Sequence, residues 1–300
     1  MRTFYELTRR NLKVFFKDKG MFISSLITPI ILLVLYATFL ARVYKDSFFS
    51  ALPDGFSVDP KIIDATVAGQ LISSLLAVSC VTISFCANLL MIGDKANGAI
   101  RDLTVTPVKR STLAGAYYFA SAVSTLIVTL TALAFGLGYL ATQGWYLSTS
   151  DVLFSILDVI LLTFFGTALS SCLHFFLSTN GQASAVGTVV SAGYGFVCGA
   201  YMPISSFGDG LRRVLGFLPG TYGTSLLKNH LLGGVFAEMG NVGFPDEAVN
   251  GIREAIDCRL FFFGHEVKTP AMFAILAGSV AFFTGLFVLF HFLFKAEKKK

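Results

Sequence analysis

The sequence predicts an all-α membrane protein in which six helices cross the bilayer. The chain has 300 residues, of which 54% are hydrophobic and only 14% charged, whereas a soluble domain carries about 25% charged residues. Its mean hydropathy is +0.71. The apolar residues lie in runs of about 20 or more, which as helices span the roughly 30 Å hydrocarbon core. These runs lack the alternation of lipid-facing strands, which favours helices over a barrel.

Charges, prolines and glycines bound each apolar run and place the spans. We predict spans at 21–40, 66–92, 111–140, 152–176, 183–201 and 271–294. They form a single transmembrane domain over residues 21–300, preceded by a cytoplasmic interfacial helix over residues 1–20. The first run follows a basic, aromatic stretch without a small-residue cleavage site, so we expect it to be a retained span rather than a signal peptide.

The distribution of basic residues sets the predicted orientation. Most of the 23 lysines and arginines lie before the first span, between the second and third spans, and after the sixth span. Short cytoplasmic segments of membrane proteins carry such an excess, so both termini are predicted to face the cytoplasm of a cell-membrane protein. The net charge of +5 fits anchoring to anionic lipid and is no evidence for nucleic acid as a partner.

Cysteine usage agrees with this topology and indicates no metal site. Cys80, Cys86, Cys172 and Cys198 fall within predicted spans, where cysteine behaves as a small apolar residue. Cys258 lies outside them, and it either pairs with a second copy of the chain or is a free thiol. No CxxC motif or histidine-rich cluster occurs.

The segment before the first span is predicted to be an amphipathic helix. Plotted at about 100° per residue, its apolar and basic side chains separate onto opposite sides. Such a helix lies at the membrane surface. It serves either as a plain lipid anchor or as a lever that passes movement from a cytoplasmic partner into the first span.

A polar stripe runs along the second predicted span. Its members share one side of the helix, and such a stripe is costly against lipid, so it faces either a water-filled path or another helix. For the path interpretation we assign these residues to the substrate route: Gln70, Ser73, Ser74, Ser84 and Asn88.

The fifth predicted span carries small residues at every fourth position, which allow another backbone to approach closely. The neighbour is either in the same chain or in a second copy, and Ala183 begins the series. The residues assigned to helix packing or to a dimer interface are Gly187, Ser191, Gly195 and Gly199.

Two ionisable residues fall in the fourth predicted span. Asp158 lies about two turns from its outer end, where we expect it to reach interfacial water, and His174 lies near its inner end. Neither provides a convincing proton relay or catalytic pair from the sequence alone.

The loop between the second and third spans is too polar to enter the bilayer. This segment, residues 93–110, contains short helix-forming stretches broken by Gly98 and Pro107. A plain solvated loop would have a similar composition.

Together these features resemble the permeases of type-2 ATP-binding-cassette (ABC) exporters. In the loop, the resemblance is carried by Asp94, Gly98, Leu103, Thr106, Pro107 and Arg110. Before and within the first span it is carried by Leu7, Arg9, Leu12 and Thr28-Pro29, and after the fifth span by Gly199, Pro203, Leu218-Pro219, Tyr222 and Leu227-Lys228. The sequence departs from the family pattern at Asp94, where Glu is usual, and at Ala99, where Thr is usual.

The resemblance implies an ATP-driven exporter subunit that works by alternating access. Two permease chains, identical or homologous, would pair and rest on ABC nucleotide-binding subunits, which would hold ATP and Mg. The coupling loop, residues 93–110, would contact the ATPase subunit. The residues assigned to that contact are Asp94, Lys95, Gly98, Arg101, Asp102, Leu103, Thr106 and Pro107.

The chain itself contains no GxxxxGK[ST] loop, so it is predicted to have no ATPase site, no catalytic residues and no cofactor of its own. The expected cargo is amphipathic: drug-like, a peptide or lipid-linked. The alternative is an ATP-independent secondary transporter or another stand-alone polytopic membrane protein, for which inverted repeats and several mid-membrane ionisable groups are typical.

For the outer segment, residues 202–270, the resemblance implies short re-entrant helices, and the residues beyond them are expected to form a small lid. Its part from Pro245 to Cys258 has apolar residues at helical spacing and acidic residues in the first turn, so we expect a short amphipathic helix there. The phenylalanines at 261–263 are expected to pack against the re-entrant helices.

Overall fold

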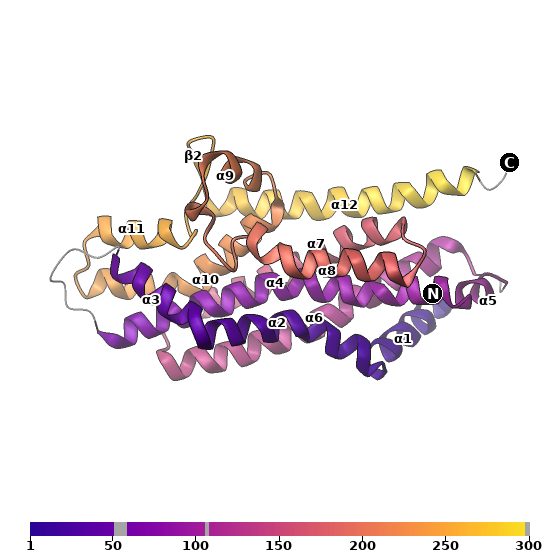
Figure 1. The fold of residues 1–300 in the computed structure, drawn as a ribbon, viewed down its shortest axis with the longest axis horizontal. Coiled ribbons are helices and arrows are strands. Elements are labelled where there is room, and N and C mark those ends of the chain that lie inside the picture. The colour runs from indigo at the N-terminus through magenta and orange to yellow at the C-terminus, as the bar shows by residue number, and fades with distance from the viewer. Residues whose placement is uncertain (51–58, 106–107, 298–300) are drawn as a thin grey trace.

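The computed structural model describes residues 1–50, 59–105 and 108–297 and shows an elongated bundle of helices (Figure 1). Among these residues, five segments are long and apolar enough to cross a membrane: Lys19–Asp46, Pro60–Ala96, Arg110–Gln143, Thr149–Phe175 and Thr269–His291. They correspond to predicted spans one to four and six. The prediction of an all-α membrane protein is therefore confirmed for the described chain, apart from one short hairpin.

The elements follow one another in this order along the chain: α1 (Arg2–Lys17), α2 (Lys19–Leu35), η1 (Tyr36–Leu40), α3 (Ala41–Ser50), α4 (Pro60–Ala96), α5 (Ala99–Val105), α6 (Arg110–Gln143), α7 (Thr149–Phe175), α8 (Asn180–Val197), η2 (Ile204–Ser206), α9 (Asp209–Leu215), α10 (Pro219–Asn241), α11 (Asp246–Ala255), β1 (Leu260–Phe262), β2 (His265–Val267) and α12 (Thr269–Glu297).

Helix α4 forms the centre of the bundle. It runs for 37 residues from its N-cap Asp59, whose side chain accepts a hydrogen bond from the amide of Lys61 at 2.9 Å. It is buried along most of its length and contacts α2, α6, α7, α8 and α10. A Cβ atom at Gly166 of α7 would lie 2.8 Å from the carbonyl oxygen of Cys80, so a glycine is needed where these two backbones meet.

The first predicted span extends beyond residue 40. Helix α2 contains Pro29, passes into the π-helical turn η1, and continues as α3 to Ser50. The first span is therefore part of one long helical segment that continues past residue 40.

Helix α8 reproduces the fifth predicted span only in part. It has 18 residues and ends at Val197, and its glycines, serines, threonine and glutamine keep it out of the five most apolar segments. At about 1.5 Å per residue it extends about 27 Å, close to the thickness of the hydrocarbon core. Six spans therefore remain a prediction.

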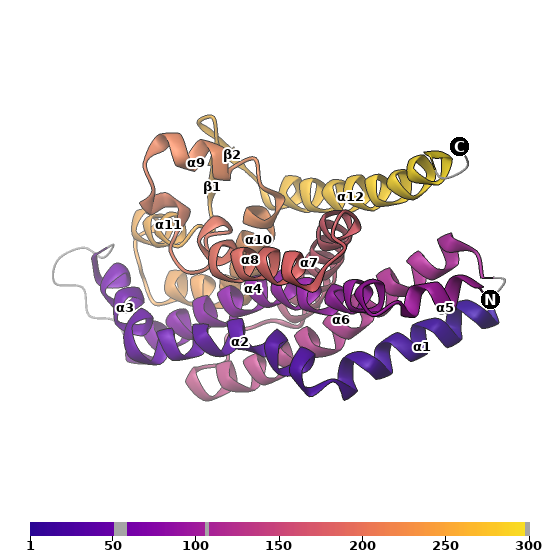
Figure 2. The ribbon, with the colours of Figure 1, turned by 45° about the vertical axis from the view of Figure 1, so that its right-hand side comes forward.

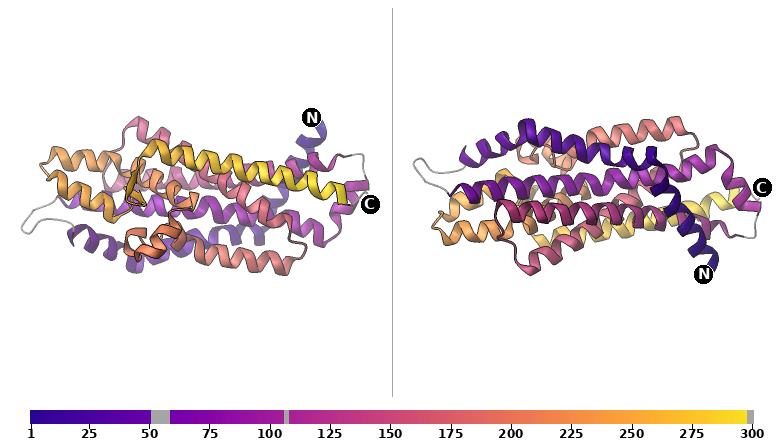
Figure 3. Two further views of the ribbon diagram at one scale, coloured as in Figure 1. Left: turned by 90° about the horizontal axis from the view of Figure 1, so that it is seen from above. Right: turned by 90° about the horizontal axis from the view of Figure 1, so that it is seen from below.

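One end of the bundle gathers α1, α5 and the end of α12, whereas α3 and α11 lie at the other end (Figure 3). Helix α1 packs along α6 and α2 and buries Thr8, Asn11 and Phe15. The predicted N-terminal helix is thus present, but the face that it turns toward the bundle carries two polar side chains, Thr8 and Asn11, beside Phe15.

Between α8 and α12, helix α9 and the β1–β2 hairpin form a layer at the side of the bundle, whereas α10 lies within the bundle (Figure 2). Where short re-entrant helices were predicted, α10 runs for 23 residues and contacts α4, α7 and α12. Helix α11 occupies the predicted amphipathic stretch and buries Ile252, with Ile256 just beyond it. Strands β1 and β2 pair antiparallel, and the ring of Phe217 after α9 contacts that of Phe262 with centroids 5.0 Å apart, as predicted.

Candidate functional site

Helix α5 projects from the end of the central helix α4 and is the exposed tip of the predicted coupling loop. A turn at Asn97 and Gly98 separates the two helices, and Gly98 adopts a φ of +80°, which disfavours residues with a side chain. No residue of α5 is buried, and Arg101 and Asp102 are exposed. Leu103 packs against a small apolar cluster that includes Leu90. Thr106 and Pro107, also assigned to the partner contact, lie outside the described residues.

Asp94, at the base of this loop, is tied to two other helices. Its carboxylate forms an ion pair with Arg10 of α1 and accepts a hydrogen bond from the hydroxyl of Tyr117 of α6 at 2.5 Å. The Asp94 carboxylate raises the pKa of Arg10, because the hydrogen bond and charge favour the protonated guanidinium. Only 10% of the Asp94 side chain is exposed. The structure therefore brings the predicted interfacial helix and the predicted coupling loop together through one ion pair.

Lys95, the next residue, lies against the end of α7. Its Nζ atom donates to the carbonyl oxygens of His174 at 3.4 Å, Phe175 at 3.2 Å and Leu177 at 3.1 Å. These carbonyls close the last turn of α7, where a cation is favourable. Lys95 therefore joins α4 to α7, and within this chain it is Arg101 and Asp102 that stay exposed for a partner.

The inner half of the polar stripe on α4 makes hydrogen bonds to α6 and α7. The hydroxyl of Ser84 lies 3.2 Å from that of Thr167 and 3.4 Å from that of Thr125. The side-chain amide of Asn88 donates to the hydroxyls of Ser170 and Ser171. In this single chain these two residues serve helix packing, which was one of the two interpretations of the stripe.

The outer half of the stripe is also buried. Gln70 is 3% exposed, and the hydroxyl of Ser73 donates to its carbonyl oxygen at 2.9 Å. Ser74 is 1% exposed, and its hydroxyl has no hydrogen-bond partner among the described residues. All five stripe residues are thus inaccessible in this conformation, and their assignment to a substrate route remains a prediction that requires the helices to separate.

The small-residue series on α8 divides into two parts. Ala183 and Gly195 are buried, and α8 contacts α4. Gly187 and Ser191 are partly exposed, and a Cβ atom at Gly187 would meet nothing within 4 Å. A side chain at Gly187 would therefore have no neighbour within the described chain.

Gly199 does not belong to the helical series, which corrects the assignment made from its spacing. Helix α8 ends at Val197, and Gly199 lies in the following turn with a φ of +74°. Its carbonyl oxygen accepts a hydrogen bond from Nζ of Lys228 at 2.9 Å. The glycine is needed for this turn rather than for a helix face.

Asp158 forms a buried pair that was missed from the sequence. Its Oδ2 atom lies 2.6 Å from Nδ1 of His230 on α10, and the two side chains are 0% and 12% exposed. Asp158 therefore does not reach interfacial water, which corrects that expectation. His230 and Lys228 interrupt an apolar stretch of α10, and these ionisable residues were the signal that could have revealed the pair.

A second buried ion pair holds the segment after α8. Nζ of Lys228, which is 1% exposed, lies 3.8 Å from Oδ2 of Asp257. The Asp257 carboxylate also accepts hydrogen bonds from the amides of Ile204 at 2.6 Å and Ser205 at 3.1 Å. Cys258 beside it is buried, and burial raises the pKa of its thiol to about 12. The structure thus favours a free, protonated thiol over a disulfide with a second copy.

Comparison with known proteins agrees with these features. Residues 2–232, which include α1 to α9 and half of α10, match the family model described as ABC-2 type transporter. No curated protein matches the chain. Because the family match covers more than half of the sequence, this chain belongs to the ABC-2 type transporter family and is a multi-pass membrane permease that has no ATPase site.

Proposed function

We propose that this chain is the permease subunit of an ATP-driven exporter that moves an amphipathic substrate out of the cytoplasm by alternating access. The observation that carries the proposal is the ion pair between Arg10 and Asp94 at the base of α5. It joins the end of α4, from which the exposed α5 projects, to α1, at the end of the bundle where the end of α12 also lies (Figure 1).

The arrangement provides a route for force from a partner into the membrane helices. Helix α5 offers Arg101 and Asp102 to an ABC nucleotide-binding subunit, which would bind ATP and Mg. Movement of α5 passes directly into α4, because only Asn97 and Gly98 separate the two helices. It also passes into α7 through Lys95 and into α1 through Asp94. A push on the loop therefore reaches three helices together.

A second copy of the chain, or a homologous permease, completes the pathway in this proposal. Helix α8 buries only Ala183 and Gly195 in the single chain, although its composition is too polar for wide exposure to lipid. Small residues at Gly187 and Ser191 would allow a second copy to approach there. Separation of the helices around α4 would then expose the polar stripe to drug-like, peptide or lipid-linked cargo.

The orientation of the chain follows in the same proposal. Helices α1 and α5 lie at one end of the bundle and carry basic residues that favour the cytoplasmic side (Figure 3). Both termini would then face the cytoplasm, where ATP is available to the partner subunit.

Charge reversal in α5 tests the coupling. The double variant Arg101→Glu and Asp102→Lys should insert normally, but ATP hydrolysis by the co-purified partner should no longer depend on the permease. The matched control is Lys61→Glu at the opposite end of α4, which is also exposed. Unchanged coupled transport in the α5 variant, or transport without any ATP-binding partner, contradicts the proposal.

Cross-linking tests the dimer. A cysteine introduced at Gly187 should form a disulfide between two copies under mild oxidation, because a Cβ atom there is free of contacts within the chain. The control is Gly278→Cys on α12, where a Cβ atom is equally free and where no partner is proposed. Equal cross-linking at both positions would indicate random collisions and not a defined interface.

A further inference from the structure

The layer formed by α9 and the β1–β2 hairpin carries an open pocket beside the start of α12. The pocket has a volume of about 460 Å³ and is lined by Asp209, Arg212, Arg213, Glu254 and the phenylalanines 261–263. This volume is within the range of about 300–1,000 Å³ that is typical of small-ligand sites. No residue of this pocket takes part in the proposed coupling or transport route.

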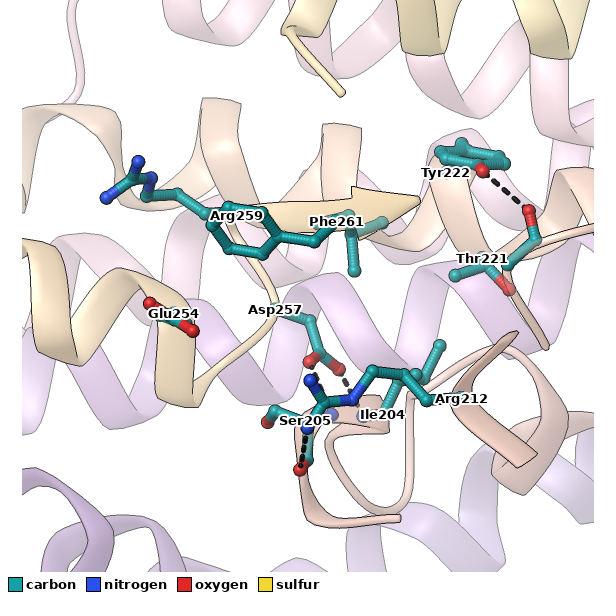
Figure 4. Close-up of a pocket in the computed structure, with 11 residues that line it drawn as sticks. Ile204, Ser205, Arg212, Thr221, Tyr222, Glu254, Asp257, Arg259 and Phe261 are labelled. Atoms are coloured by element: carbon teal, nitrogen blue, oxygen red, sulfur yellow. Dashed lines mark hydrogen bonds between the residues drawn. The ribbon is translucent and has the colours of Figure 1, made fainter. Parts of the chain in front are cut away.

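A narrow inner pocket of about 30 Å³ adjoins the open one and shares Arg212, Glu254 and Phe261 with it (Figure 4). Its wall is fixed by Asp257, which holds the amides of Ile204 and Ser205. The guanidinium of Arg212 donates to the carbonyl oxygen of Ser205 at 3.3 Å, and its Nε atom has no partner among the described residues. Arg212 is thus held in place while part of its donor capacity remains unused.

The charges that line the open pocket balance one another but do not pair. Arg212 and Arg213 provide two positive charges, and Asp209 and Glu254 provide two negative charges. Among the described residues, no ion pair within 4.0 Å joins these four side chains. A ligand that carries both signs of charge therefore matches the pocket better than an anion or a cation.

The aromatic wall adds a second preference. The ring of Phe262 lies edge-on to those of Phe217 and Phe263, with centroids 5.0 and 4.7 Å away. Such rings attract ammonium groups through their faces, especially beside carboxylates. Arginine side chains bind phosphate through several parallel hydrogen bonds.

The position of the pocket matches the depth of lipid headgroups. The hairpin ends at Val267, immediately before the apolar helix α12 begins at Thr269. Around the pocket, large apolar side chains of α9, its flank and the β1–β2 turn are exposed: Leu211, Val214, Phe217 and Phe263. Acyl chains would cover these side chains while the headgroup occupies the charged pocket.

We propose that this pocket, formed by α9, the end of α11 and the β1–β2 hairpin, binds a zwitterionic phospholipid through its phosphate and ammonium groups. The arginines hold the phosphate, and the carboxylates and phenylalanine rings hold the ammonium group. The site anchors the lateral layer to one leaflet, independently of which way the chain is oriented or what it transports.

Native mass spectrometry of the detergent-purified full chain tests the lipid preference without ATP or a partner. Palmitoyl-oleoyl phosphatidylethanolamine should bind more tightly than phosphatidylglycerol with the same acyl chains. Arg213→Gln should weaken binding of both lipids by about tenfold, the loss expected for one charge-assisted contact. Arg42→Gln, an exposed arginine of α3, is the matched control and should have no effect.

Glu254→Gln gives the sharper result. It leaves an excess of positive charge in the pocket, so the preference should shift from phosphatidylethanolamine to phosphatidylglycerol. Both Arg213 and Glu254 are exposed, so these variants should fold. Equal binding of the two lipids to the unmodified chain, or no difference between Arg213→Gln and Arg42→Gln, overturns the proposal.

Soluble glycerophosphoethanolamine distinguishes a lipid from a free headgroup. It should displace the lipid only at much higher concentration, because it lacks the acyl chains that cover Phe217 and its neighbours. Displacement at equal concentration would show that the pocket binds a soluble ligand, and the lipid assignment would be wrong. None of these outcomes depends on transport activity, so they can be separated from a failure of the proposed function.

Discussion

Removal of His230 should strongly destabilise the bundle, because it leaves the carboxylate of Asp158 buried without a partner. Oδ2 of Asp158 has His230 at 2.6 Å, and Oδ1 already has no partner among the described residues. With the side chain 0% exposed, water cannot replace the lost contact. In the His230→Leu variant the leucine fills a similar volume, but it cannot form a hydrogen bond with the carboxyl group of Asp158.

Removal of one partner from a buried pair of this kind leaves either an unpaired charge or an unsatisfied polar group, which costs about 1–5 kcal/mol. For chains of about this size each kcal/mol changes Tm by about 2–4 °C, so the expected loss is on the order of 10 °C. Asp158→Leu should cost less, because the remaining imidazole is 12% exposed and can be neutral. The double variant Asp158→Leu with His230→Leu should recover much of the loss, since neither buried polar group remains.

Thermal unfolding of the detergent-purified chain measures these differences. His230 also stacks on Phe154, with ring centroids 5.1 Å apart, so Phe154→Leu serves as the control for the lost stacking. If His230→Leu lowers Tm no more than Phe154→Leu, or if the double variant is the least stable of all, the ion-pair reasoning is wrong.

Further predictions concern the close helix contact, the buried thiol and the second ion pair. Gly166→Ala should lower Tm, because its Cβ atom would meet the backbone of α4 at 2.8 Å. The control Gly278→Ala should be neutral or stabilising, because nothing lies within 4 Å of that position. Equal effects of the two variants in thermal unfolding would refute the close approach. Cys258 should resist maleimide labelling up to mildly alkaline pH, since it is buried and its thiol has a pKa of about 12, and should react once the chain is denatured; mass spectrometry that finds rapid labelling of the folded chain would contradict this. Asp257→Ala should destabilise more than Asp257→Asn, by about 1–3 kcal/mol in chemical unfolding, because Asn keeps an acceptor for the amides and tolerates the φ of +63°; equal destabilisation by the two variants would show that the carboxylate charge alone matters.

The hydropathy and length of the apolar runs were enough to locate the five most apolar segments. Each segment that crosses a membrane must by itself satisfy its backbone hydrogen bonds and exclude charge, so the evidence for it lies in its own sequence. The N-terminal helix and α11 were also predictable, since each has a local periodic pattern. The resemblance to type-2 ABC exporter permeases was confirmed by the family match over residues 2–232. These features depend on neighbouring residues along the chain.

The boundaries of α8 were less predictable, because the repeat of small residues continues to Gly199 although the helix ends at Val197. Spacing alone cannot distinguish a glycine on a helix face from a glycine in a left-handed turn. The turn at Gly199 is held by a hydrogen bond from Lys228 to the carbonyl oxygen of Gly199. These two residues are 29 positions apart in the sequence.

The sequence by itself determined that the chain is a helical membrane protein of the ABC-2 permease type, and it marked Asp94 and Asp158 as unusual. Only the tertiary structure decided that Asp94 pairs with Arg10, 84 residues away, and Asp158 with His230, 72 residues away. Each polar group in an apolar bundle must find a partner, but the composition of a helix does not specify which one. The partner is set by how the helices are rotated and shifted against one another, which depends on the packing of the whole bundle.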